Sequence, residues 1–212
     1  MMEDGKVSLH LSMHLVVYVD LLGQAAELVK VRSMPTTEKE IEAARVAVDQ
    51  SAGCVLRLRH RFRDVMSELM TAHSQLVELI APEHRGAFMR LQPQVNQIGF
   101  SDTFVVSVPL REDGELEGPA RAASTLYNVL VGVAGISLLA LSEGVPLRGG
   151  LQIGPAVDVF PQEIYGAPLV DAYQLESQVA EYPRTVVSPD LFGYLEYLER
   201  LPSDGKFNDY AT

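Results

Sequence analysis

Two carboxylates stand out because each adjoins a short apolar run that is typical of a buried strand. Asp20 ends the run at residues 16–19, and Asp102 lies between Gly99 and the β-branched run at residues 104–108. Carboxylate oxygens are ligands that Mg²⁺ and Mn²⁺ prefer, and two such ions can act together on a triphosphate. The pair therefore indicates a site for divalent metal ions and a nucleotide.

Each carboxylate also has an ordinary structural explanation. An Asp before a helix commonly caps its N-terminus, and an Asp in a turn commonly binds its own backbone. Taken singly these roles are the more common ones, and the combination favours metal binding. The carbonyl of Leu21 is then a third metal ligand, and the backbone N–H groups of Leu22, Gly23 and Gln24 are predicted to bind phosphates at the start of a helical pattern.

Composition limits the classes of protein to which the chain can belong. Its 212 residues are 47% hydrophobic and 21% charged, which predicts a folded chain with a sizeable core. The net charge of −11 disfavours a nucleic-acid partner, because backbone binding rests on Lys and Arg. The basic run at residues 57–63 is expected to form a solvated or internally paired helical face.

No apolar run reaches the roughly 20 residues that a membrane helix needs, so no membrane partner is expected. The nearest run, residues 126–141, is predicted to be a buried helix. The single cysteine, Cys54, excludes an intrachain disulfide, and the start of the chain lacks the cationic region of a secretory signal. These features favour a cytoplasmic location.

Periodicity predicts the elements that must position the two carboxylates. Strands are expected at residues 15–19, 96–98, 104–108, 151–159 and 185–188, and helices at 24–31, 36–70, 76–80, 119–143, 170–179 and from 189 onward. Residues 99–101 are predicted to be the turn of a hairpin, and residues 165–168 another turn. Tyr18 is expected in the core, on the face opposite Asp20.

This order predicts an α+β sandwich, with a mainly antiparallel sheet covered by helices. The chain is interpreted as one domain, residues 1–212, with a helical insert at about 31–93. Its end at residues 209–212, without a final strand, suggests a truncated chain.

Four segments occur in an informative order: Val-Tyr-Val-Asp-Leu-Leu-Gly at 17–23, Ile-Gly-Phe-Ser-Asp-Thr-Phe at 98–104, Arg-Gly-Gly-Leu-Gln-Ile-Gly-Pro-Ala at 148–156, and Tyr-Gly at 165–166 with Ala-Tyr-Gln-Leu-Glu-Ser at 172–177. Together they resemble the class III nucleotidyl cyclase catalytic domain. The resemblance implies a ferredoxin-like sandwich that works as a head-to-tail homodimer with active sites at the interface. It also implies two divalent metal ions, Mn²⁺ or Mg²⁺, bound by Asp20 and Asp102.

The chain departs from the family in the half of the site that binds base and ribose. Val170 takes the position of the ribose-binding Asn, and Gln174 that of the Arg that stabilises the transition state. Arg148 or Arg184 is a candidate to replace that cation, although a surface ion pair explains either. Tyr173 is a candidate to stack on a pyrimidine or simply to pack.

Ala167 replaces the Asp that often selects adenine, and residues 95–99 lack the charged residue that selects a purine. With the long helical insert and the Phe-Ser-Asp hairpin, this resembles the bacterial pyrimidine cyclases of anti-phage (Pycsar) defence. The resemblance implies a uridylate cyclase, a lyase that converts UTP, or next CTP, to its 3′,5′-cyclic monophosphate and pyrophosphate.

By analogy with that branch, the cyclic UMP would be a second messenger in antiviral defence, read by an effector that responds to a cyclic nucleotide. Two alternatives remain open at this point. One is a divergent adenylate or guanylate cyclase, and the other is a catalytically inactive, cyclase-like nucleotide-binding module.

Overall fold

A computed structural model describes residues 11–79, 81–89, 95–111, 118–160 and 163–200. Its centre is a six-stranded sheet in the order β2-β3-β1-β4-β5, with β6 paired to β4. The strands are β1 (Leu11–Leu21), β2 (Asn96–Phe100), β3 (Thr103–Arg111), β4 (Leu147–Phe160), β5 (Glu163–Gly166) and β6 (Thr185–Val187). The β4–β6 pair is parallel and the others are antiparallel, which confirms the predicted α+β class.

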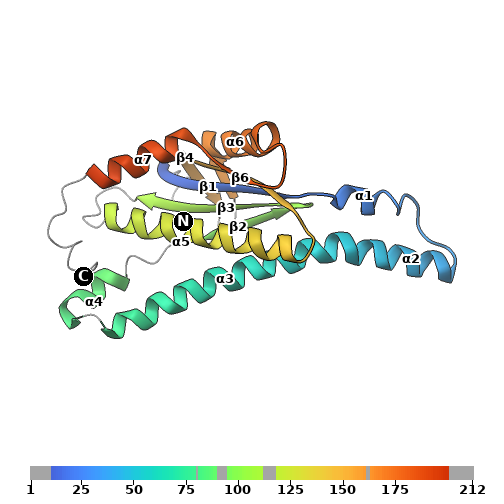
Figure 1. Ribbon diagram of the computed structural model, residues 1–212, viewed down its shortest axis with the longest axis horizontal. Coiled ribbons are helices and arrows are strands. Elements are labelled where there is room, and N and C mark those ends of the chain that lie inside the picture. Colours follow the sequence, from blue (N-terminus) through green and yellow to red (C-terminus); the bar gives the residue numbers. More distant parts are fainter. Residues whose placement is uncertain (1–10, 80, 90–94, 112–117, 161–162, 201–212) are drawn as a thin grey trace, which may run out of the picture.

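Helices cover both faces of this sheet (Figure 1). They are α1 (Gln24–Leu28), α2 (Glu38–Val48), α3 (Cys54–Leu76), α4 (Pro82–Met89), α5 (Gly118–Ser142), α6 (Ala167–Gln174) and α7 (Pro189–Arg200). A π-helical turn, Asp49–Gly53, joins α2 to α3, and a second, Leu175–Val179, continues α6. Helices α3 and α5 lie below the sheet in Figure 1, and α6 lies above it.

Strand β1 separates two hydrophobic clusters because its side chains alternate between the faces of the sheet. Leu15, Val17 and Val19 belong to the large cluster under α3 and α5, in which Phe62 packs on Phe104 with ring centroids 5.6 Å apart. Val16 belongs to the smaller cluster under α6, and Tyr18 packs against that cluster.

Tyr18 therefore does not point away from Asp20, and the prediction that it lies on the opposite face is wrong. The two residues are two positions apart, so they share the α6 face. Tyr18 is partly buried, and the negative charge of Asp20 adds to the burial that raises its pKa.

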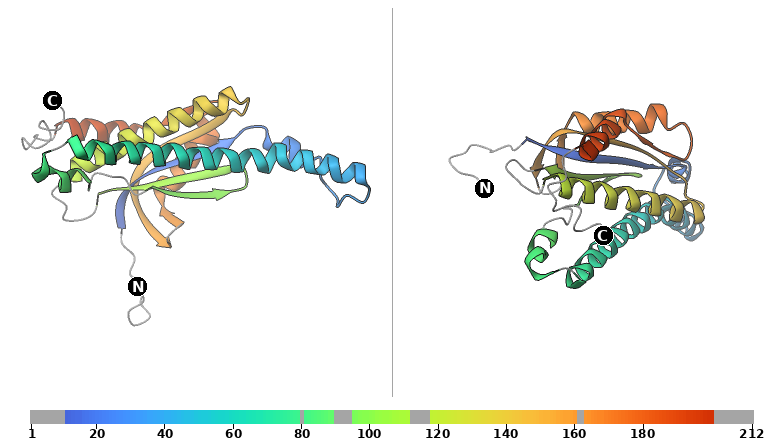
Figure 2. Two further views of the ribbon diagram at one scale, coloured as in Figure 1. Left: turned by 90° about the horizontal axis from the view of Figure 1, so that it is seen from below. Right: turned by 60° about the vertical axis from the view of Figure 1, so that its left-hand side comes forward.

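The chain between β1 and β2 forms a helical arm. Thr37 caps α2 in a capping box with Glu40. Helix α3 is anchored on the core by Val55, Leu58 and Phe62, whereas α2 extends beyond the sheet (Figures 1 and 2). The predicted insert at 31–93 is helical over most of its described part. Helix α3 ends at Leu76, and a short 3₁₀ turn, Val77–Leu79, takes the place of the helix predicted at 76–80.

Helix α5 is long and apolar enough, by length and composition, to cross a membrane. One side of it packs on the sheet through Ala122, Leu126, Val129 and Ile136, as the prediction of a buried helix requires. Its other side is exposed, for example at Leu138, so the helix is buried along one face only.

Two predicted turns differ from the structure. The hairpin turn predicted at 99–101 lies instead at Ser101 and Asp102, because Phe100 pairs with Thr103. Ser101, with φ of 51°, adopts the left-handed conformation in this turn. Tyr165 lies in strand β5, which pairs with β4, and not in a turn. The end of the chain at 209–212 lies outside the described residues.

Candidate active site

The fold brings Asp20 and Asp102 together. Asp20 lies near the end of β1 and pairs with Thr103 of β3, so it is next to the hairpin turn that carries Asp102. The backbone N–H of Leu21 donates a 3.1 Å hydrogen bond to the carbonyl oxygen of Asp102. The two carboxylates that the sequence singles out therefore share one corner of the sheet.

The electrostatics of this corner favour a bound cation. Burial raises the pKa of Asp20 above its ordinary value, and the negative charge of Asp102 raises it further, whereas Arg148 opposes both. A divalent ion would relieve the repulsion, and carboxylate oxygens suit Mn²⁺ or Mg²⁺. Among the described residues, no three His, Cys, Asp or Glu side chains are grouped so that together they could hold a metal ion.

A partly buried ion pair adjoins Asp20, with the Arg148 side chain 25% exposed and that of Glu176 3% exposed. Arg148 of β4 pairs with Asp20 across the sheet, and its Nη2 lies 3.4 Å from Asp20 Oδ2 and 2.8 Å from Glu176 Oε1. Glu176 is only 2% exposed, and burial raises its pKa, while Arg148 opposes that shift. Arg148, a predicted substitute for the missing cation, is thus engaged with two carboxylates of its own chain.

Helix α6 reaches this position because β4 offers it no side chain at Gly150. A Cβ at Gly150 would clash with the carbonyl oxygen of Ala172 and lie 2.8 Å from Leu175 Cβ. The close approach brings Glu176 against the sheet. Sequence reasoning did not select Glu176 as a site residue, although it stands in the Leu-Glu-Ser segment that carries the resemblance.

The predicted phosphate-binding segment is only partly open. The N–H of Leu22 donates to the carbonyl of Pro146 at 3.0 Å, so it is used within the fold. Gly23 is exposed with φ of 88°, a conformation that favours glycine. The Gln24 side chain is buried, and its amide, oriented to satisfy its hydrogen bonds, donates to the carbonyls of Gln50 and Ser51.

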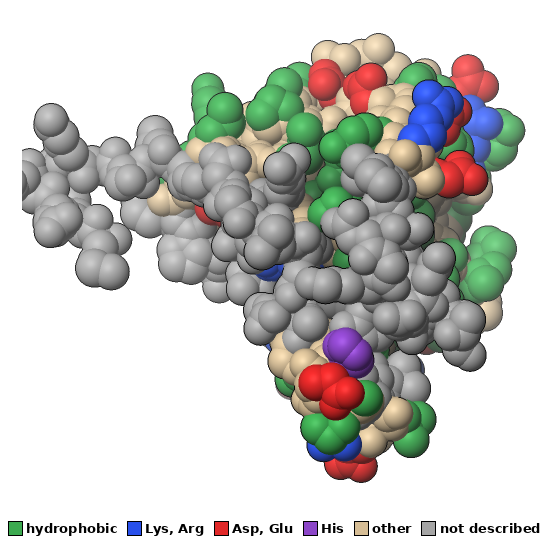
Figure 3. Space-filling view, turned by 90° about the vertical axis from the view of Figure 1, so that its left-hand side faces the viewer, with side chains coloured by type: hydrophobic (Ala, Val, Ile, Leu, Met, Phe, Trp, Pro, Cys, Tyr) green, Lys and Arg blue, Asp and Glu red, His purple; other side chains and the backbone are tan. Residues whose placement is uncertain are grey.

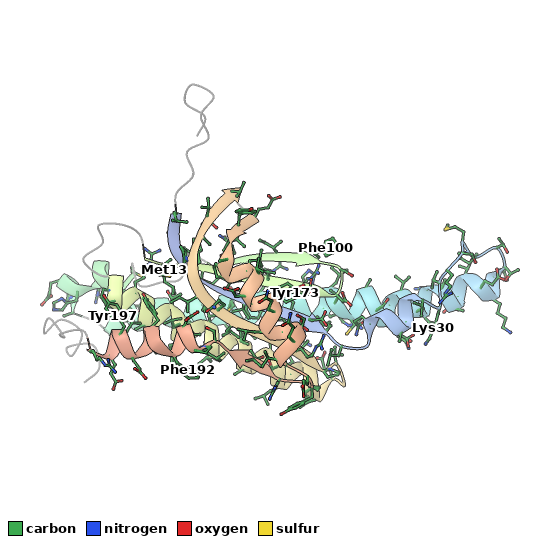
Figure 4. The ribbon with its side chains drawn as sticks, turned by 90° about the horizontal axis from the view of Figure 1, so that it is seen from above. Met13, Lys30, Phe100, Tyr173, Phe192 and Tyr197 are labelled. Carbon is green, nitrogen blue, oxygen red and sulfur yellow. The ribbon has the colours of Figure 1, made fainter. Side chains whose placement is uncertain are left out.

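The residues predicted for the base and transition-state half lie on the outer surface of the α6 segment. Val170, Tyr173 and Gln174 are exposed, and the Tyr173 ring makes an edge contact with Tyr18 at 5.4 Å. Figure 4 shows Tyr173 over the sheet, with Phe100 at the tip of the β2–β3 hairpin. These three side chains are therefore open to solvent in the single chain.

Arg184, the other candidate cation, is turned toward its own segment. Its guanidinium lies 4.4 Å from the centre of the Tyr182 ring and donates to the Tyr182 hydroxyl and the Val179 carbonyl. The arrangement satisfies Arg184 locally, so its side chain would have to move to reach a bound nucleotide.

The surface agrees with the acidic composition. Figure 3 views the end of the molecule opposite the α2 arm, and its described part shows acidic side chains among hydrophobic ones without a continuous basic patch.

Of the comparisons with known proteins, the one with solved structures found similar folds. No family model matches the sequence, and no curated protein matches it. Among solved structures, the guanylate cyclase domain of RhGC from Catenaria anguillulae, in complex with GTP, aligns with a TM-score of 0.50 at 13% identity, over 88% of this chain and 84% of that one.

Two further structures are similar. The monomeric guanylyl cyclase domain of the RhoGC fusion protein from Blastocladiella emersonii has a TM-score of 0.45 at 15% identity, over 90% of each chain. A bacterial light-regulated adenylyl cyclase has a TM-score of 0.48 at 11% identity, over 88% of this chain and 46% of that one. The alignment with the Catenaria anguillulae domain establishes that the chain has the fold of a nucleotidyl cyclase catalytic domain.

Proposed function

We propose that this protein is a metal-dependent nucleotidyl cyclase that converts a nucleoside triphosphate to its 3′,5′-cyclic monophosphate. The observation that carries the proposal is the meeting of Asp20 and Asp102 at one corner of a cyclase-type sheet. In the reaction, the ribose 3′-oxygen forms a bond to the α-phosphorus. The bond from that phosphorus to the bridging oxygen breaks, and pyrophosphate leaves.

Asp20 and Asp102 would hold two divalent ions, Mn²⁺ or Mg²⁺, together with the carbonyl of Leu21. When bound, such ions lower the pKa of the 3′-hydroxyl and neutralise the phosphates. The backbone N–H groups of Gly23 and Gln24 would bind the β- and γ-phosphates. Leu22 has no part in this, because its N–H donates to Pro146.

We propose a pyrimidine nucleotide as the substrate, with UTP favoured over CTP. Strand β2 presents no charged side chain over residues 95–99, where the family carries its purine-selecting residue. The exposed Tyr173 offers an aromatic face for stacking, and the Gln174 amide can both donate and accept hydrogen bonds with a pyrimidine edge.

These side chains would act across a homodimer interface. In a head-to-tail pair, Val170, Tyr173 and Gln174 of one chain would meet the Asp20–Asp102 corner of the other. Their exposure in the single chain is in keeping with such an arrangement. By family analogy, the cytoplasmic dimer would make a second messenger for anti-phage defence and a cyclic-nucleotide-responsive effector.

One observation favours a second candidate, a cyclase-like module that binds nucleotide without catalysis. Arg148 already places a positive charge 3.4 Å from Asp20 Oδ2, where it competes with a metal ion. Tight binding of a metal–nucleotide complex without release of pyrophosphate would support this reading over an active cyclase.

The test is to incubate the purified protein with Mn²⁺ and each of the four labelled nucleoside triphosphates separately, and to resolve the products. We expect cyclic UMP, and cyclic CMP would keep the pyrimidine class. A cyclic purine product would retain the cyclase and contradict the pyrimidine assignment. Metal-dependent binding without any product would favour the inactive module.

A further inference from the structure

One basic residue of the run at 57–63 is not a solvated charge. Arg59 of α3 extends along the edge of the sheet, and its Nη2 donates to the carbonyl of Ser101 at 2.9 Å and to that of Thr103 at 2.6 Å. These two residues flank Asp102. A side chain of the helical arm thus contacts the turn that carries one of the proposed metal ligands.

Gly99 allows this contact. A Cβ at position 99 would overlap the carbon of the Arg59 guanidinium and lie 2.7 Å from Nε. A side chain at position 99 would therefore require the flexible end of Arg59 to shift, and the left-handed conformation of the turn is adopted by Ser101. A non-glycine residue in that region is strained and persists where its surroundings hold it.

Three consecutive carbonyls of the turn are held from outside it. Arg59 binds those of Ser101 and Thr103, and the N–H of Leu21 binds that of Asp102. Burial lowers the pKa of Arg59, and the negative charge of Asp102 opposes that shift, so the carboxylate also attracts the guanidinium. Hydrogen bonds from a charged donor are the stronger ones, which makes Arg59 a main support of the turn.

We propose that Arg59 is a positioning residue that fixes the turn so that Asp102 faces Asp20 at the distance that metal binding requires. The inference rests on the proposed function, because it assumes that Asp102 is a metal ligand. Arg59 does not itself touch metal or substrate. Groups that orient a metal ligand typically change metal affinity or activity about 10- to 100-fold when they are replaced.

The test compares Arg59→Gln, Arg59→Lys and Gly99→Ala with Arg63→Gln as the matched control. Arg63 is exposed one turn further along α3 and lines the same groove beside Gly99. Gly99→Ala displaces the Arg59 guanidinium without changing its charge, so it tests the same contact if Arg59→Gln folds poorly. Circular dichroism and thermal melting establish folding for each variant.

Three readouts follow: amide hydrogen exchange of the peptide covering residues 99–104, Mn²⁺ affinity by electron paramagnetic resonance, and the Mn²⁺ dependence of turnover. We expect Arg59→Gln and Gly99→Ala to speed exchange in the hairpin and weaken Mn²⁺ binding about 10- to 100-fold. Saturating Mn²⁺ should restore most of the turnover, with KM for the nucleotide little changed. Arg59→Lys, which keeps a cationic donor, should recover part of the affinity.

The inference would be overturned if hydrogen exchange and Mn²⁺ affinity were unchanged in Arg59→Gln and Gly99→Ala. It would also be overturned if Arg63→Gln changed them as much as Arg59→Gln does. A wild-type protein that binds Mn²⁺ but makes no cyclic nucleotide would refute the proposed function alone, because exchange and affinity still decide the role of Arg59. A wild-type protein that binds no Mn²⁺ would overturn both.

Discussion

The backbone N–H of Leu21 lies 3.1 Å from the carbonyl oxygen of Asp102 and donates a hydrogen bond to it. This bond joins the end of β1 to the β2–β3 turn through the main chain. This main-chain contact uses neither carboxylate, although Asp20 is already paired with Arg148 at 3.4 Å.

Replacing either carboxylate by its amide should therefore abolish activity and preserve the fold. Asp20→Asn and Asp102→Asn keep the side-chain shape and the Leu21 bond, but remove the charge that binds metal. A metal contributes several kcal/mol to catalysis, so turnover should fall at least about 100-fold. The measurement is cyclic-nucleotide formation at fixed Mn²⁺, with Asp64→Asn, an exposed carboxylate of α3, as the control. Wild-type rates in either variant would refute the metal assignment.

The raised pKa of Asp20 predicts how stability depends on pH in metal-free buffer. A carboxylate whose pKa is higher in the folded state binds protons better there, so its contribution to stability falls as pH rises from its ordinary value of 3.8 through the raised native value. Asn mimics the protonated form. Asp20→Asn should therefore exceed the wild type in free energy of unfolding at neutral pH, and the difference should vanish below pH 3.8.

Denaturant unfolding with EDTA at several pH values measures this difference. A bound divalent ion would stabilise the ionised Asp20, so added Mn²⁺ should reverse the order of the two proteins. An Asn variant that is less stable than the wild type at neutral pH without metal would contradict the prediction.

Much of the fold could be predicted because it follows from local pattern. The apolar run of β1 and the starts of the helices near residues 36 and 189 are readable in sequence. The structure caps these helices with Thr37 and with Ser188, whose Oγ accepts a hydrogen bond from the Leu191 N–H. The proximity of Asp20 and Asp102 could be predicted because their two segments occur in the order that the cyclase domain shows. Tyr18 lies on the same face as Asp20 because side chains two positions apart on a strand point the same way.

The supporting residues of the site could not be predicted, because they depend on contacts between distant segments. Arg59 meets the hairpin 42 residues along the chain, and Arg148 is 128 residues from Asp20. Nothing in a basic helical run distinguishes the one arginine that turns inward. The sequence predicts Gly99 in the turn, whereas it lies in β2 and leaves space for that arginine.

The ion pair of Arg148 and Glu176 should be strongly coupled. Arg148→Gln leaves the carboxylate of Glu176, 3% exposed in its side chain, without its cation, and removing one partner of a buried pair costs about 3–5 kcal/mol. The Arg148→Gln/Glu176→Gln double variant should lose less than the sum of the single losses. Urea unfolding of the four proteins gives the coupling energy, and strictly additive losses would show that the pair does not stabilise the fold.

The position of α6 should depend on the absence of a side chain at Gly150. Gly150→Ala would force the Ala172 carbonyl and Leu175 away from β4, and should lower the melting temperature sharply. Gly135→Ala is the matched control, because that exposed position in α5 has open space around its Cβ, and should stabilise by about 0.5–1 kcal/mol. Equal melting temperatures for the two variants would contradict the close packing of α6.

Shared active sites predict that two inactive variants restore each other. Asp20→Asn removes the metal half of a site, and Tyr173→Ala combined with Gln174→Ala removes the half proposed to come from the partner chain. A mixed dimer holds one doubly altered site and one intact site. Equal mixing makes half of the dimers mixed, so activity should recover to roughly a quarter of the wild-type rate.

The measurement is cyclic-nucleotide formation by each variant alone and after joint refolding. Recovery would place Tyr173 and Gln174 opposite the carboxylates of the partner chain, and no recovery would place each complete site within a single chain.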